Sequence, residues 1–143
     1  MPVVEQSALL PYTDQQMFDL VNDIESYPQY MDGCLEASII SRSGDEICGR
    51  LKLGMAGLSY EFSTRNILIP PHEMVMELIE GPFKKFHAVW QFKALSNTAC
   101  KTSLYLEFEF SSGLIDLTLK KLFENTSKNL VKAVCIRADK IYG

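Results

Sequence analysis

The sequence has no long apolar run. No stretch approaches the roughly 20 consecutive apolar residues that a membrane-spanning helix needs, so we expect no transmembrane segment. Sequence typical of a strand begins at Pro2, which predicts that there is no signal or transit peptide. We therefore expect a cytoplasmic protein, and peripheral contact with a membrane is the alternative.

The sequence also lacks the motifs of metal sites, disulfide frameworks and common enzymes. Its two histidines, His72 and His87, are far apart and have no ligand spacing to other residues. The GxSxG, HExxH, P-loop and GxGxxG motifs are all missing. The four cysteines, which we expect to be reduced, are Cys34, Cys48, Cys100 and Cys135. We predict no metal, no required cofactor and no catalytic residue.

Excess positive charge is absent as well. The 143 residues contain 14 Lys and Arg against 18 Asp and Glu, a net charge of −4, which argues against a protein that binds nucleic acid with its whole surface, and we expect no binding to DNA. The charge is uneven, however. Residues 114–143 carry six Lys or Arg and three Asp or Glu, so this segment is +3 and the remainder is −7.

The pattern of apolar residues predicts one α+β domain over 1–143. A first strand over 3–10 is followed by a helix for which Thr13 and Gln16 form a capping box, and then by a second short helix or turn near Tyr30. Alternating residues separated by turns predict about six more strands between 35 and 110, giving about seven in all. Such sequential hairpins make a curved antiparallel sheet.

Residues 114–142 contain no Pro or Gly and have a period near 3.6, which predicts one long helix of roughly 40 Å. A long helix over a curved sheet can leave a hollow between them. Apolar residues of the helix fall on one side at 100° per residue: Leu119, Phe123, Leu130, Val134 and Ile141. They either fill a core or face that hollow.

The opposite side of this helix carries a basic stripe, defined by Lys121, Lys128 and Lys132 with Asn125 between them. The stripe is either a solvated surface or a contact for anionic lipid headgroups or RNA phosphates.

Arg137 falls near the centre of the apolar side of the helix. A buried guanidinium needs partners. It either pairs with a sheet carboxylate such as Glu107 or Glu109, reaches solvent past the sheet edge, or presents donors to a polar ligand head inside the hollow.

Aromatic and Met residues on the expected strands either fill the core or line an apolar pocket. They are Met74, Met76, Trp90, Phe92, Phe108 and Phe110. Periodicity does not separate the two possibilities.

Six short segments, in order along the chain, resemble the coenzyme-Q-binding START-like family of the polyketide cyclase/START superfamily, in its branch of bacterial ribosome association toxins. They are FDLV at 18–21, IESYP at 24–28, EGPF at 80–83, WQF at 90–92, FEFSS at 108–112 and RA at 137–138. One position departs from the family pattern, because Gly33 precedes Cys34 where the family often has an aromatic residue.

The resemblance implies a helix-grip fold with an apolar tunnel for a quinone or another lipid-like ligand. It also implies binding to the large ribosomal subunit that hinders joining to the small one. We expect a non-catalytic protein that binds and chaperones an isoprenoid quinone, ubiquinone above all, or another apolar small molecule in support of respiration. A regulator that binds the large ribosomal subunit is the alternative, and an aromatase/cyclase-type enzyme is the third.

Overall fold

The computed structural model describes residues 2–111, 113 and 115–143. Leu114, the expected first residue of the last helix, and Ser112 before it lie outside the described residues.

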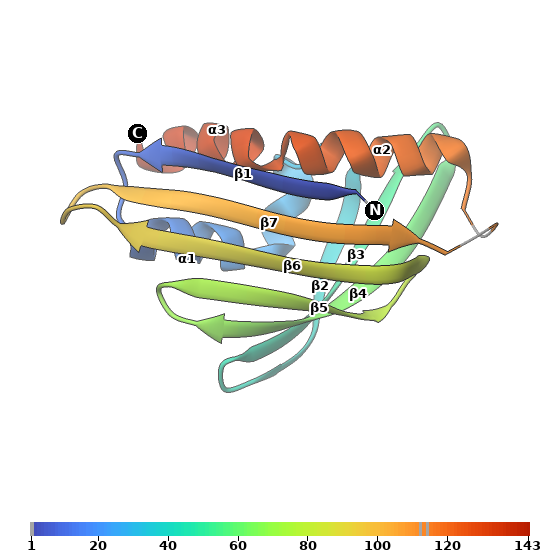
Figure 1. The fold of residues 1–143 in the computed structure, drawn as a ribbon, viewed down its shortest axis with the longest axis horizontal. Coiled ribbons are helices and arrows are strands. Elements are labelled where there is room, and N and C mark those ends of the chain that lie inside the picture. The colour runs from blue at the N-terminus through green and yellow to red at the C-terminus, as the bar shows by residue number, and fades with distance from the viewer. Residues whose placement is uncertain (1, 112, 114) are drawn as a thin grey trace.

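Seven strands form one antiparallel sheet in the order β1-β7-β6-β5-β4-β3-β2 (Figure 1). The strands are β1 (Val3–Leu10), β2 (Cys34–Ser43), β3 (Glu46–Met55), β4 (Leu58–Ile69), β5 (Glu73–Glu80), β6 (Phe83–Ala94) and β7 (Cys100–Phe110). The helices are α1 (Asp14–Asn22), the 3-10 helix η1 (Ile24–Gln29), α2 (Leu117–Lys128) and α3 (Leu130–Tyr142). The predicted α+β class, the strand number and the two short N-terminal helices are confirmed.

Strands β2 to β7 form a meander, and β1 joins it beside β7 with Val4 opposite Leu106 and Leu10 opposite Cys100. Along β7, the even-numbered residues from 102 to 108 are buried and their neighbours are more exposed. This alternation is what the period of two predicts for a sheet with one covered face.

The C-terminal helical segment lies across the covered face of the sheet (Figure 1). Helix α2 packs on β3 and β4, whereas α3 packs on β1, β7 and α1. The curved sheet thus holds the helical segment from both sides, which is the helix-grip arrangement expected from the sequence.

The expected single helix is divided at Asn129. The Asn129 side chain donates a hydrogen bond to the carbonyl of Asn125 (2.9 Å), and the Ser127 hydroxyl donates one to the carbonyl of Phe123 (2.7 Å). Polar side chains that bond to the preceding turn compete with the helical hydrogen bonds and bend helices. The absence of Pro and Gly was therefore not enough to predict one continuous helix.

The residues of α3 that are buried differ in part from those that the sequence predicted. Helix α3 buries Val131, Val134 and Ala138, whereas Ile141, which the sequence placed on the apolar side, is 49% exposed. An ideal 100° rotation carried from α2 into α3 does not predict the exposure of Ile141, since α3 packs on β1, β7 and α1 whereas α2 packs on β3 and β4. Among the described residues, no helix is long and apolar enough to cross a membrane.

The capping box predicted at the start of α1 is present. The Thr13 hydroxyl accepts the amide of Gln16 (3.1 Å), and the Gln16 side chain accepts the amide of Thr13 (2.8 Å). We expect Thr13→Ala to lower the free energy of unfolding by about 1 kcal/mol in urea denaturation, because an amide at the helix start loses its partner.

Thr118→Ala is the matched control for this measurement. Thr118 is exposed on the first turn of α2, and in the part of the chain that the structure describes its hydroxyl makes no hydrogen bond. We expect its effect to stay below about 0.5 kcal/mol. Equal losses in the two variants would contradict the role of the Thr13 hydroxyl.

Candidate functional site

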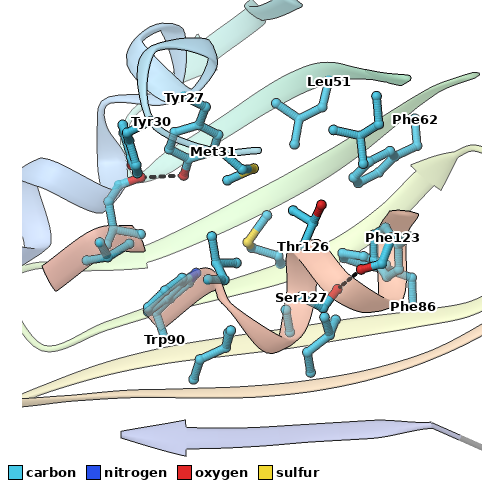
Figure 2. A pocket seen from close by; sticks show the side chains of 18 residues that line it. Tyr27, Tyr30, Met31, Leu51, Phe62, Phe86, Trp90, Phe123, Thr126 and Ser127 are labelled. Atoms are coloured by element: carbon cyan, nitrogen blue, oxygen red, sulfur yellow. Dashed lines mark hydrogen bonds between the residues drawn. The ribbon is translucent and has the colours of Figure 1, made fainter. Parts of the chain in front are cut away.

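An apolar cavity lies between the sheet and the two C-terminal helices. Its volume is about 60 Å³, well below the roughly 300 Å³ at which ligand pockets typically begin. Figure 2 shows Tyr30 and Trp90 toward one end of this space and Phe62, Phe86 and Phe123 toward the other. The interior is therefore nearly filled by the protein's own side chains.

Five of the eleven residues predicted to line a tunnel do line this cavity: Met76, Trp90, Phe123, Leu130 and Val134. The other six do not: Met74, Phe92, Phe108, Phe110, Leu119 and Arg137. Periodicity gives the face on which a side chain lies, but it does not give the position along the strand at which the space opens.

Packing accounts for most of the side chains that lie elsewhere. Phe92 contacts Phe18 of α1 edge to face, with 5.8 Å between ring centroids. Phe108 and Phe110 lie against Phe123, at 4.7 and 5.6 Å. These rings fill the space around the cavity instead of lining it.

Sequence reasoning missed most of the remaining lining residues. Leu104 and Leu106 share the buried face of β7 with Phe108 and could have been found by the same alternation. Tyr27, Tyr30 and Met31 come from η1 and the turn after it, where no period marks an inward side chain. Only the tertiary structure brings this turn over the helices.

Two tyrosines that line the cavity differ in their hydrogen bonding. The Tyr27 hydroxyl donates to the carbonyl of Val21, whereas the Tyr30 hydroxyl is buried and has no partner among the described residues. Burial raises the pKa of both hydroxyls, and Arg137 offsets part of that rise in the pKa of Tyr30. Both groups stay neutral at physiological pH, so the Tyr30 hydroxyl can donate to a ligand acceptor.

The turn after Tyr30 is held against α2. The Thr126 hydroxyl donates to the carbonyl of Asp32 (2.9 Å), and Gly33 has a φ of +80°, which favours glycine. A Cβ at Gly33 would lie 2.8 Å from the side chain of Leu122. A larger residue at this position would require the Leu122 side chain to shift and would hold the backbone in a strained conformation.

A basic groove lies on the outer side of this turn, between η1 and α3. Its volume is about 410 Å³. The residues that line it are Gln29, Tyr30, Asp32, Asn129, Lys132, Ala133, Ile136, Arg137 and Lys140. Of the described residues, Tyr30 alone lines both this groove and the cavity, so its ring forms part of the wall between them.

Arg137 lies in the groove and not in the cavity. Its guanidinium donates to the side chain of Gln29 (2.9 Å) and lies over the ring of Tyr30, 5.4 Å from the centroid. Of the alternatives for Arg137, pairing with Glu107 or Glu109 is wrong, since Arg137 bonds to Gln29 and Glu107 pairs with Lys85 (2.6 Å) on the other face of the sheet. Arg137 therefore lies on the side of α3 that faces Gln29 and Tyr30.

The basic stripe is exposed as the sequence predicted. Lys121 and Lys128 lie on α2, Lys132 lies on α3, and all three side chains face solvent. In the described ranges of the chain none of the three takes part in an ion pair within 4.0 Å, and Lys132 also lines the basic groove.

The cavity offers little acid–base chemistry. The described residues that line it include no Asp, Glu, His, Lys or Arg. Burial raises the pKa of the Cys34 thiol to about 11, so this thiol is not activated as a nucleophile. Across residues 2–111, 113 and 115–143 no group of His, Cys, Asp and Glu could hold a metal ion.

Residues 10–135 match the family described as polyketide cyclase / dehydrase and lipid transport. The chain belongs to this family. It is also similar, at 40% identity over 140 residues, to the ribosome association toxin RatA of Pseudomonas aeruginosa, covering 98% of this chain and 97% of the relative. The RatA of Escherichia coli K12 is 38% identical over 99% of this chain and 90% of its own.

A more distant relative is the mitochondrial coenzyme Q-binding protein COQ10 homolog B of Xenopus laevis. It is 25% identical over 96% of this chain and 58% of its own length. The recognised family and its branch are thus confirmed.

Solved structures confirm the fold. The START superfamily protein of Mycobacterium smegmatis has a TM-score of 0.80 at 22% identity and covers 97% of this chain and 98% of its own. The Zhui aromatase/cyclase of Streptomyces sp. R1128 has a TM-score of 0.83 at 17% identity and covers 97% and 94%. The family contains both cyclases and proteins named for binding, so membership does not by itself assign catalysis.

The unpartnered hydroxyl of Tyr30 predicts an unusual stability effect. Tyr30→Phe removes a buried polar group that lacks a partner, and we expect it to raise the free energy of unfolding by about 1 kcal/mol. Tyr27→Phe breaks a hydrogen bond and should lower it by about 1 kcal/mol. Urea denaturation of the two variants beside the wild type measures both changes.

Tyr60→Phe is the control for this comparison, since the Tyr60 hydroxyl is also buried without a partner among the described residues but does not line the cavity. It should stabilise the protein as Tyr30→Phe does. A loss of stability on Tyr30→Phe would mean that this hydroxyl is bonded in solution, to water or to a ligand.

Proposed function

We propose that this protein associates with the large ribosomal subunit through the basic stripe of Lys121, Lys128 and Lys132, and hinders joining to the small subunit. Its RatA relatives, at 38% and 40% identity over nearly the whole chain, support ribosome association. The observation that carries the proposal is the run of exposed, unpaired lysines on the outer side of α2 and α3. Such a protein acts in the cytoplasm and performs no catalysis.

The distribution of charge supports contact through the C-terminal helices. Residues 1–41 contain seven Asp or Glu and no Lys or Arg, whereas residues 114–143 carry a net charge of +3. RNA phosphates attract the second segment and repel the first, so the approach of the protein to an RNA surface is oriented. The net charge of −4 limits binding to other polyanions.

The stripe predicts binding that depends on salt. If the protein makes three phosphate contacts, a fourfold rise in salt concentration should lower its affinity for RNA about 20- to 40-fold, because each contact releases condensed counterions. We expect Lys121→Glu, Lys128→Glu and Lys132→Glu combined to reduce co-sedimentation with large subunits at least about tenfold. A subunit-joining assay should then show that the variant no longer hinders assembly.

A charge-matched variant controls for the change in net charge. Arg50, Lys93 and Lys101 are exposed on β3, β6 and β7, away from the C-terminal helices, and replacing all three by Glu changes the net charge equally. It should co-sediment as the wild type does. Unchanged binding of the stripe variant would remove the stripe from the proposal, and absence of wild-type binding at low salt would end it.

A second candidate is carriage of an apolar ligand such as ubiquinone. The cavity wall is almost entirely apolar and contains the free donor of Tyr30, which suits a quinone carbonyl. The similarity to the coenzyme Q-binding protein supports the same idea. The cavity of about 60 Å³ must expand several-fold to hold a quinone head, so this function requires the turn of Tyr30 or the helices to move.

Trp90 is the single tryptophan of the chain and lines the cavity, so its fluorescence reports on ligand entry. We expect a short-chain ubiquinone to quench it at saturable concentrations. Tyr30→Phe should weaken this binding about two- to tenfold by removing one hydrogen bond, whereas Tyr60→Phe should leave it unchanged. Unquenched Trp90 up to the solubility limit of the quinone would rule out the second candidate.

A further inference from the structure

The basic groove between η1 and α3 carries concentrated positive charge. Three cations, Lys132, Arg137 and Lys140, line it together with one carboxylate, Asp32, which gives a formal charge of +2. In the described part of the chain none of these three cations forms an ion pair within 4.0 Å. The groove therefore attracts anions, and its volume of about 410 Å³ falls within the range of small-molecule sites.

Arg137 is held in position for such a role. One of its terminal nitrogens donates to Gln29 at 2.9 Å, and the guanidinium lies 5.4 Å from the centroid of the Tyr30 ring. These contacts restrict the side chain. Among the described residues, only one of the five N–H donors of the guanidinium is used in a hydrogen bond. A planar fork whose orientation is already fixed loses less entropy when it binds the oxygens of a phosphate.

The groove is continuous with the basic stripe. Lys132 belongs to both, with Lys128 and Lys121 preceding it along the helices and Arg137 and Lys140 following it. A single RNA strand that follows the stripe therefore reaches the groove at Lys132, which belongs to both. This continuity favours an RNA backbone over a free anion as the occupant.

We propose that the groove is an RNA phosphate-binding site, in which Arg137 is the central ligand and Lys132 and Lys140 flank it. The inference rests on the proposed ribosome association and adds to it a site with residues outside the stripe. The stripe supplies attraction along its length, and the groove supplies one position at which a phosphodiester is held by an oriented guanidinium.

The test measures binding of a short oligouridylate by fluorescence anisotropy between about 50 and 200 mM salt. We expect Arg137→Gln to weaken binding about tenfold. The slope of the logarithm of the binding constant against the logarithm of the salt concentration should fall by the amount expected for about one phosphate contact. Arg137→Lys should keep the slope but recover only part of the affinity, because it retains the charge and loses the fork. Lys140→Gln, at an exposed position, should reduce the slope without loss of stability.

Lys93→Gln, at an exposed position on β6, is the matched control and should change neither affinity nor slope. Co-sedimentation of the same proteins with large subunits separates the two proposals. Suppose that the wild type binds large subunits, and that Arg137→Gln and Lys140→Gln bind both the subunits and the oligouridylate with the affinity and salt slope of the wild type. The groove site is then wrong, and ribosome association stands. If the wild type does not bind subunits, ribosome association fails, and the oligouridylate measurement alone decides the groove.

Vesicles that contain anionic phospholipid test whether the groove binds RNA rather than a lipid surface. Binding of these vesicles through Arg137 and Lys140, with no binding of oligouridylate, would overturn the inference. Binding of oligouridylate that the vesicles do not displace would support it.

Discussion

The contact of Phe123 with the sheet determines the interior of this protein. Its ring lies within 4.7 to 6.4 Å, centroid to centroid, of five other phenylalanines on β4, β6 and β7, namely Phe62, Phe83, Phe86, Phe108 and Phe110. Aromatic pairs of this kind contribute about 0.5–1.5 kcal/mol each beyond the area they bury. They fix α2 on the sheet, and they occupy space that a tunnel would need, which leaves a cavity of about 60 Å³.

The rest of the site follows from that constraint. With α2 fixed, Thr126 holds the turn of Asp32, and Arg137 of α3 lies over the ring of Tyr30. Tyr30 then separates a small apolar space from a larger basic one. The two sites proposed here, an RNA phosphate site in the groove and a ligand site in the cavity, would thus lie on opposite sides of one aromatic ring.

Much of the fold could be predicted because it depends on local patterns. Alternation along 102–110 gave a strand with one covered face, Thr13 and Gln16 gave the start of α1, and the turns gave the meander. The candidate site was harder. Periodicity identified Met76, Trp90 and Phe123 as inward side chains, but it identified Met74 and Phe108 equally, and only their depth along the strands distinguishes cavity lining from core.

The sequence by itself determined the strands, the start of α1, the uneven charge and the exposure of Lys121, Lys128 and Lys132, because each depends on residues close together in the chain. Only the tertiary structure decided how much of the hollow remains, which residues of α3 are covered, and that Arg137 contacts Gln29 and Tyr30 rather than a sheet carboxylate. These outcomes depend on side chains more than 100 residues apart competing for the same volume, and no local period encodes that competition.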